Sequence, residues 1–171
     1  MAQLILTGFM GTGKTEVGRR LARATQRPFV DTDKLVEAAA GRSIAEIFAT
    51  EGEVRFRALE REAVQQAVAV PNAVVATGGG ALLDPDSRRL LLSAGPVVCL
   101  TATPEEILRR LGDAEDRPLL RGGTPAERLA KIRAILDARE ASYSLATHRI
   151  DTTGRSVDEL VSEIRTLVGA E

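Results

Sequence analysis

Short apolar segments separated by longer amphipathic stretches recur along this 171-residue chain. Within the apolar segments, hydrophobic residues do not alternate with polar ones, which is the pattern of strands covered on both faces. The intervening stretches repeat apolar positions at helical spacing. The pattern therefore predicts an α/β fold in which helices cover both faces of a parallel sheet. The expected strands are residues 2–7, 28–30, 73–76, 97–100 and 149–150.

Helix starts are marked by Ser or Thr followed three residues later by Glu, which is the signature of a capping box. Two of these starts also place Pro at the first helical position. A further helix is expected to begin at Asp84-Pro85 and to end before Gly95-Pro96. The four expected boxes pair Ser43 with Glu46, Thr103 with Glu106, Thr124 with Glu127, and Ser156 with Glu159.

Two segments interrupt the alternation of strands and helices. Residues 33–66 are helical in pattern without an intervening strand, which indicates an insertion after the second strand. Residues 112–124 are polar and include three glycines, and a loop of this length in a compact domain is usually functional or disordered. Within one domain of residues 1–171, we expect the first to be a substrate-binding insertion and the second a lid.

Charge and composition narrow the class of ligand. The content of 44% hydrophobic and 27% charged residues is typical of a globular protein. The formal net charge of −1 predicts no general attraction to nucleic acid or to a membrane surface, so any anion must be bound locally. This suits a small anionic ligand better than a polynucleotide.

The cellular setting is predicted from the cysteine content and from the absence of targeting patterns. The single cysteine, Cys99, lies in an apolar run and is interpreted as a core thiol rather than a nucleophile. One cysteine allows no disulfide within the chain, which fits a reducing compartment. No charged leader and no apolar stretch of about 18 residues is present. We therefore expect a cytoplasmic protein, and a monomer because no exposed apolar seam stands out.

Residues 8–15 follow the pattern G-x-x-x-x-G-K-[ST] and come directly after the first apolar run. Between a buried strand and a helix, the N–H groups of such a loop converge on a phosphate group. Lys14 is expected to reach the β- and γ-phosphates of a nucleotide, and the Thr15 hydroxyl to bind Mg²⁺. The alternative is a glycine-rich turn with an incidental lysine, but the position after a strand favours a nucleoside triphosphate site.

Two carboxylates, Asp31 and Asp33, follow the second expected strand. At positions i and i+2 of a strand they would share a face, at the edge of the sheet where ligands bind in open α/β folds. One could hold Mg²⁺ or its water, and the other could accept a proton from a substrate hydroxyl. Because the third strand has no acidic residue, Asp31 is the best metal candidate. The alternative is a helix N-cap with a solvated neighbour.

Arginines provide candidates for binding an acidic group. Arg57 and Glu60 lie at i and i+3, which is either a surface ion pair or a guanidinium oriented to bind a carboxylate. Arg139 continues an apolar helical stripe, where a charge is unusual. Arg117 lies within the expected lid and Arg110 on the helix before it. An arginine on a mobile segment could close over transferring phosphates, although each is also the kind of residue common on solvated surfaces.

Taken together, these motifs resemble the shikimate kinase family. The resemblance spans nearly the whole chain. It is most specific in the Phe-Arg-x-x-Glu element that ends at Glu60, taken together with Asp-Thr-Asp at residues 31–33 and Gly-Gly-Gly at residues 78–80. The matching segments are residues 8–15, 31–33, 41–48, 51–53, 56–60, 77–80, 117–120, 139–143 and 150–152. The resemblance implies a three-layer α/β/α P-loop kinase with a five-stranded parallel sheet of order 2-3-1-4-5. It also implies transfer of the ATP γ-phosphate to the 3-hydroxyl of shikimate, on the route to aromatic amino acids.

The same resemblance implies roles for individual residues. Asp33 would bind the substrate hydroxyls and orient or deprotonate the attacking one, while Lys14 and Arg117 would stabilise the phosphoryl group. Substrate would be bound by Asp33, Arg57, Gly79, Gly80 and Arg139. Mg²⁺ would be bound by Thr15 and Asp31. The nucleotide would be bordered by Gly11, Thr12, Gly13, Lys14, Thr15, Glu16, Arg110, Arg117 and Arg155.

Some alternatives stay open at this point. A related small-molecule kinase, acting on gluconate or a nucleoside monophosphate, would share the fold and the loop. A non-catalytic nucleotide-binding module would also share them, although Asp33, Lys14 and Arg117 are all present. Glu16 departs from the family pattern, which more often has a small hydroxyl residue there, and it places negative charge beside the phosphate site.

Overall fold

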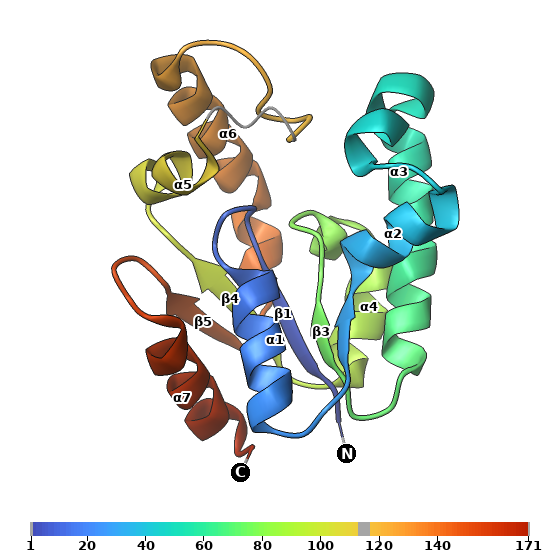
Figure 1. The fold of residues 1–171 in the computed structure, drawn as a ribbon, viewed down its shortest axis with the longest axis vertical. Helices are drawn as coiled ribbons and strands as arrows, with labels where there is room; N and C mark the ends of the chain where they lie inside the picture. Colours follow the sequence, from blue (N-terminus) through green and yellow to red (C-terminus); the bar gives the residue numbers. More distant parts are fainter. Residues whose placement is uncertain (1, 113–116, 171) are drawn as a thin grey trace.

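The computed structural model describes residues 2–112 and 117–170 and contains a five-stranded sheet in the order β2-β3-β1-β4-β5 (Figure 1). Every neighbouring pair of strands is parallel. The predicted fold class and strand order are therefore confirmed. The first strand begins two residues later than expected and includes the first glycine of the phosphate loop. The strands are β1 (Leu4–Gly8), β2 (Phe29–Asp31), β3 (Val74–Ala76), β4 (Val97–Thr101) and β5 (His148–Asp151).

Helices cover both faces of this sheet (Figure 1). On one face, Leu6 and Leu100 pack in a cluster with residues of α1 and α7. On the other face, Ile5 and Val75 pack with residues of α3 and α4. Successive strand residues point to opposite faces, so a strand covered on both faces needs apolar residues at every position. The helices are α1 (Lys14–Ala24), α2 (Thr32–Ala40), α3 (Ile44–Ala69), α4 (Pro85–Ala94), α5 (Pro104–Leu111), α6 (Pro125–Tyr143) and α7 (Val157–Val168), with a 3₁₀ helix η1 (Ala81–Leu83) after β3.

The core also contains the single cysteine. Cys99 on β4 is fully buried, and burial raises the pKa of its thiol to about 11. A thiol that stays protonated at neutral pH is a poor nucleophile. Its interpretation as a core residue agrees with this environment.

Three of the four expected capping boxes are complete. The Ser43, Thr124 and Ser156 side chains each accept a backbone N–H, and the Glu three residues on bonds back to the cap. At α5 the expectation was only half right. Thr103 accepts the N–H of Glu106, but the Glu106 carboxylate instead accepts from Arg109 and Arg110. Two guanidinium groups within reach form stronger, charge-assisted hydrogen bonds than one backbone N–H would.

All strands end at the same edge of the sheet, and helical segments rise beyond that edge on both sides (Figure 1). On one side lie α2 and the first part of α3, which together form the helical segment expected after the second strand. On the other side lie α5 and the start of α6, which flank the segment predicted as a lid. Residues 113–116 of that predicted lid lie outside the described part of the chain.

Gly52 interrupts α3 with a non-helical backbone, at φ 80° and ψ 176°. This region of backbone space is almost restricted to glycine, although a Cβ built there has no atom within 4 Å. The kink separates Phe48 from Phe56, whose ring centroids nevertheless lie 4.8 Å apart. The bend thus folds the first turns of α3 back over the segment that carries Arg57.

A Gly52→Ala substitution should therefore lower the free energy of unfolding by about 1–3 kcal/mol through backbone strain alone. Val54→Ala is the matched control, because Val54 lies two residues away with 87% of its surface exposed. Urea denaturation of both variants measures the difference. Equal stability of the two variants would contradict a backbone requirement at Gly52.

Candidate active site

The phosphate-binding loop connects β1 to α1, as its sequence predicted. Gly13 is the N-cap of α1 and provides no side chain to bond the first N–H groups of the helix. Those N–H groups and the positive end of the helix dipole favour an anion at this point. The Thr12 hydroxyl donates to the Phe9 carbonyl at 2.7 Å, which braces the loop from inside.

Lys14 projects from the first turn of α1 along this loop. Its ammonium donates to the carbonyls of Gly8 at 2.7 Å and Phe9 at 2.9 Å. The pKa of Lys14 is lowered to about 8, chiefly by burial, with nearby Asp33 acting to raise it and Arg117 acting to lower it. The protonation of this ammonium is therefore sensitive to its surroundings at neutral to mildly alkaline pH.

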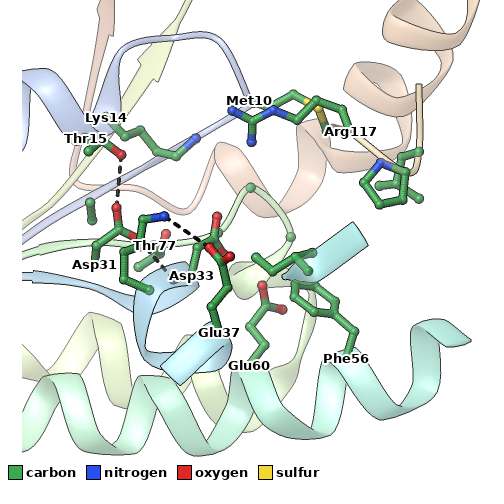
Figure 2. Close-up of a pocket in the computed structure, with 18 of the residues that line it drawn as sticks. Met10, Lys14, Thr15, Asp31, Asp33, Glu37, Phe56, Glu60, Thr77 and Arg117 are labelled. Carbon is green, nitrogen blue, oxygen red and sulfur yellow. Dashed lines mark hydrogen bonds and ion pairs between the residues drawn. The ribbon is translucent and has the colours of Figure 1, made fainter. Parts of the chain in front are cut away.

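Asp31 and Asp33 do not share a strand face, so that expectation was wrong, and the alternative of a helix N-cap is borne out for Asp31. Asp31 ends β2, but its side chain accepts the backbone N–H of Asp33 at 3.0 Å, which makes it the N-cap of α2. The chain turns into a helix at Thr32 because this carboxylate satisfies a helix N–H that would otherwise lack a partner. The other oxygen of Asp31 accepts from the Thr15 hydroxyl at 3.0 Å (Figure 2). Asp31 thus acts as a cap and also contacts the phosphate loop.

Asp33 lies in the first turn of α2 and lines the same cavity. Burial raises the pKa of its carboxyl group, and the neighbouring Asp31 raises it further, whereas Lys14 and Arg117 act in the opposite direction. In Figure 2, Lys14 and Arg117 lie across the cavity from Asp33 and Glu60. Two cationic groups therefore face a carboxylate across a space next to the phosphate loop.

Arg57 and Glu60 form an ion pair of 2.8 Å, and it is not a surface pair. Glu60 is only 3% exposed, and burial raises the pKa of its carboxyl group against the effect of Arg57. The Arg57 guanidinium also lies 5.1 Å from the centre of the Phe56 ring. One buried carboxylate and one aromatic face thus fix the orientation of this guanidinium.

Arg139 is buried within α6, with 4% of its surface exposed. Its guanidinium lies 5.7 Å from the centre of the Phe9 ring and donates to the Tyr143 hydroxyl at 3.5 Å. The sequence pattern placed this charge on an apolar stripe, and Ile132 on the same stripe is fully buried. The arginine therefore points inward, towards the carboxyl edge of the sheet, rather than to solvent.

The three glycines after β3 each face a different charged side chain. A Cβ on Gly78 would lie 2.5 Å from Glu60 Oε2 and 3.0 Å from Asp33 Oδ1. A Cβ on Gly79 would lie 2.9 Å from Arg139 Nη1, and one on Gly80 would lie 2.5 Å from Arg57 Nη1. Any larger residue would displace these groups. The glycine segment, residues 78–80, therefore lets charged groups from three helices approach one stretch of backbone.

A cavity of about 610 Å³ joins these groups to the phosphate loop. It is also lined by Phe48, Thr77 and Leu119, which no sequence pattern had marked with a role. Phe48 belongs to residues 41–48, one of the segments that carry the family resemblance, but that resemblance implied no role for it. The predicted site residues that share this cavity are Gly11, Gly13, Lys14, Thr15, Glu16, Asp31, Asp33, Arg57, Gly79, Gly80, Arg117 and Arg139.

A second cavity of about 500 Å³ lies behind the phosphate loop. Arg110 crosses it and donates to the Gly11 carbonyl at 3.0 Å and to both oxygens of Thr152. Arg155 lines the same cavity and pairs with Glu163 on α7. Thr12 and Glu16 line this second cavity as well. The predicted nucleotide residues that do not line the first cavity, Thr12, Arg110 and Arg155, therefore all lie here.

Comparison with known proteins decides the family. A family model described as shikimate kinase matches residues 10–168. The chain belongs to the shikimate kinase family. The shikimate kinase of Geobacter metallireducens is 52% identical over 161 residues, covering 94% of this chain and 88% of the relative. That of Pelotomaculum thermopropionicum is 44% identical over 164 residues, covering 96% of this chain and 94% of the relative.

A solved shikimate kinase has the same fold. The shikimate kinase from Acinetobacter baumannii, solved in complex with shikimate, superimposes with a TM-score of 0.93 and 36% identity, covering 98% of this chain and 93% of that one. These findings confirm the predicted family, fold and enzyme class, which is an ATP-dependent phosphotransferase. Across residues 2–112 and 117–170, none of the helices has the length and apolar character needed to cross a bilayer.

The pKa of Lys14 predicts how this shikimate kinase family member should use ATP as pH changes. Because the ammonium loses its proton above about pH 8 in the free enzyme, kcat/KM for ATP should fall about tenfold per pH unit above that value. The corresponding fall in kcat should occur at higher pH, since bound phosphates favour the charged lysine.

Steady-state rates between about pH 6 and pH 10 measure both profiles. A Lys14→Arg variant should lose the alkaline fall even if its rate is low, because arginine stays protonated. Replacing the exposed Lys131 by Gln should leave the profile unchanged. A flat kcat/KM profile in the unaltered protein would contradict the assignment.

Proposed function

We propose that this protein transfers the γ-phosphate of ATP to the 3-hydroxyl of shikimate. The observation that carries this proposal is the convergence of Arg57 and Arg139, from two different helices, on the adjacent residues Gly79 and Gly80. Shikimate has one carboxylate and several hydroxyls. Two oriented guanidinium groups suit the carboxylate, and Asp33 in the same cavity suits a hydroxyl.

The nucleotide would bind with its phosphates on the N–H groups of the loop and α1. Mg²⁺ fits here, because the Thr15 hydroxyl and the Asp31 carboxylate place two oxygen ligands 3.0 Å apart beside the loop, and Mg²⁺ prefers oxygen ligands together with substrate phosphates. When bound, the ion would neutralise charge on the phosphate oxygens. Arg110 and Arg155 would border the rest of the nucleotide, since both line the second cavity.

Transfer would then depend on positioning and charge. The 3-hydroxyl oxygen would bond to the γ-phosphorus as the bond to the β,γ-bridging oxygen breaks, and Asp33 would orient that hydroxyl and accept its proton. A raised pKa makes Asp33 a stronger base than an exposed aspartate. Lys14 and Arg117 would stabilise the transferring phosphoryl group. The N–H groups of the glycine segment would add contacts to the substrate.

The flanking segments have parts in the same proposal. Residues 33–66 would form the substrate-binding insertion, because this stretch provides Asp33, Arg57 and Glu60. Residues 112–124 would form the lid that carries Arg117. We further propose a cytoplasmic monomer that acts on the two small molecules without nucleic acid or membrane, in line with the net charge of −1.

The direct test is release of ADP from Mg-ATP with shikimate, gluconate, AMP or no acceptor. Turnover confined to shikimate is the expected result. Turnover with another acceptor would support a kinase activity but contradict shikimate as the substrate. A protein that binds ATP but turns over none of the acceptors would contradict the catalytic proposal.

Arg57→Ala should raise the KM for shikimate about tenfold to a hundredfold, because it removes a charge-assisted bond to the carboxylate. The KM for ATP should change little. Arg61→Ala is the matched control, since Arg61 lies one turn along α3 and pairs with Asp84 at the surface. Equal increases in both KM values for Arg57→Ala would refute the carboxylate assignment.

Asp33→Asn should lower kcat about 10²–10⁴-fold, the range expected for loss of a general base. Calorimetric titration should show ATP binding within a few-fold of the unaltered protein. Glu37→Gln is the control, because Glu37 lines the same cavity one turn further along α2. A fully active Asp33→Asn variant would exclude Asp33 as base or as orienting group.

A further inference from the structure

Tyr143 is the last residue of α6, is 3% exposed, and has no role in the proposed reaction so far. Its hydroxyl donates to the Gly79 carbonyl at 2.7 Å, across 64 residues of sequence. The same oxygen receives the 3.5 Å contact from Arg139 Nη1. One buried hydroxyl thus links two of the groups that face the acceptor side of the cavity.

The bond to Gly79 determines more than the position of one carbonyl. The Gly79 carbonyl and the Gly80 N–H belong to the same planar trans peptide, in which the two groups point in opposite directions. Glycine peptides have few steric limits on rotation, so an unheld segment could adopt several orientations. A carbonyl held by Tyr143 therefore fixes the direction of the Gly80 N–H.

The contact with Arg139 follows from the chemistry of a phenol. A hydroxyl has one proton, and that of Tyr143 is used towards Gly79, so a lone pair remains for the guanidinium. Burial raises the pKa of Tyr143, which keeps the proton on the oxygen at neutral pH. With the Phe9 ring also near its guanidinium, Arg139 is held by two side chains from different elements.

We propose that Tyr143 is a positioning residue, which sets the orientation of the Arg139 guanidinium and of the Gly79–Gly80 peptide before the acceptor binds. Both groups are then oriented by one hydroxyl that does not itself touch the acceptor. The arrangement lowers the entropy lost when the acceptor carboxylate is bound. This inference rests on the proposed binding of a carboxylate-bearing acceptor.

The test is Tyr143→Phe, which keeps the ring and removes only the hydroxyl. We expect the KM for the acceptor to rise about five- to thirtyfold, the loss typical of one hydrogen bond that leaves a buried partner unsatisfied. The KM for ATP should stay within about twofold, and kcat should fall less than the acceptor KM rises. Ser142→Ala, which removes a buried hydroxyl from the preceding residue, should leave all three constants near their original values.

A double-mutant cycle with Arg139→Ala separates positioning from simple packing. If Tyr143 acts through Arg139, the combined variant should raise the acceptor KM by much less than the product of the two single effects. An unchanged acceptor KM in Tyr143→Phe, or fully multiplicative effects, would overturn the proposal. So would a thermal destabilisation accompanied by equal changes in both KM values.

The unaltered protein separates this inference from the proposed function. Its own turnover shows which acceptor it uses, and all KM ratios are then measured with that acceptor. Absence of shikimate turnover would count against the proposed function. Normal shikimate turnover with an unaffected Tyr143→Phe variant would count against Tyr143 alone.

Discussion

The proposed acceptor side of this candidate site depends on a stretch of backbone without side chains. Because residues 78–80 have no side chains, four charged groups can approach their backbone more closely than a Cβ would permit. These groups belong to Glu60, Asp33, Arg139 and Arg57. Charges of both signs can then lie in one small volume, each oriented by a neighbour. Placing a Cβ at any of the three positions would move at least one charged group from its present position.

The sheet order explains why this segment lies beside the phosphate loop. Strand β3 lies between β2 and β1, so its carboxyl end has Asp31 on one side and the first glycine of the loop on the other. Parallel strands end at one edge, and the loops that follow them meet there. The residues proposed to bind the nucleotide and those proposed to bind the acceptor thus become neighbours through strand order, although they are far apart in the sequence.

Local patterns were sufficient to predict the strands, most helix starts, the phosphate loop and the family. Each depends on residues close together in the chain, such as the apolar run before Gly8 or the Ser43 capping box. The site was harder to predict where a residue has two functions. Asp31 and Asp33 looked like neighbours on a strand, but the capping bond of Asp31 begins a helix between them.

Long-range contacts were beyond the reach of pattern alone. Tyr143 was part of a recognised motif, but its bond to Gly79 spans 64 residues and depends on how α6 packs against the segment that follows β3. The burial of Glu60 likewise decides between a surface ion pair and a group that orients Arg57. A spacing of three residues between Arg57 and Glu60 fits both interpretations, and only the tertiary structure distinguishes between them.

The central claim is that Arg57 and Arg139 meet an acceptor carboxylate over the glycine segment while Asp33 meets a hydroxyl. A crystal structure of this protein with shikimate and Mg-ADP tests it most directly. We predict both guanidinium groups within hydrogen-bonding distance of the carboxylate, and Asp33 within that distance of the 3-hydroxyl. A carboxylate bound away from both arginines, or a 3-hydroxyl without Asp33, would contradict the account.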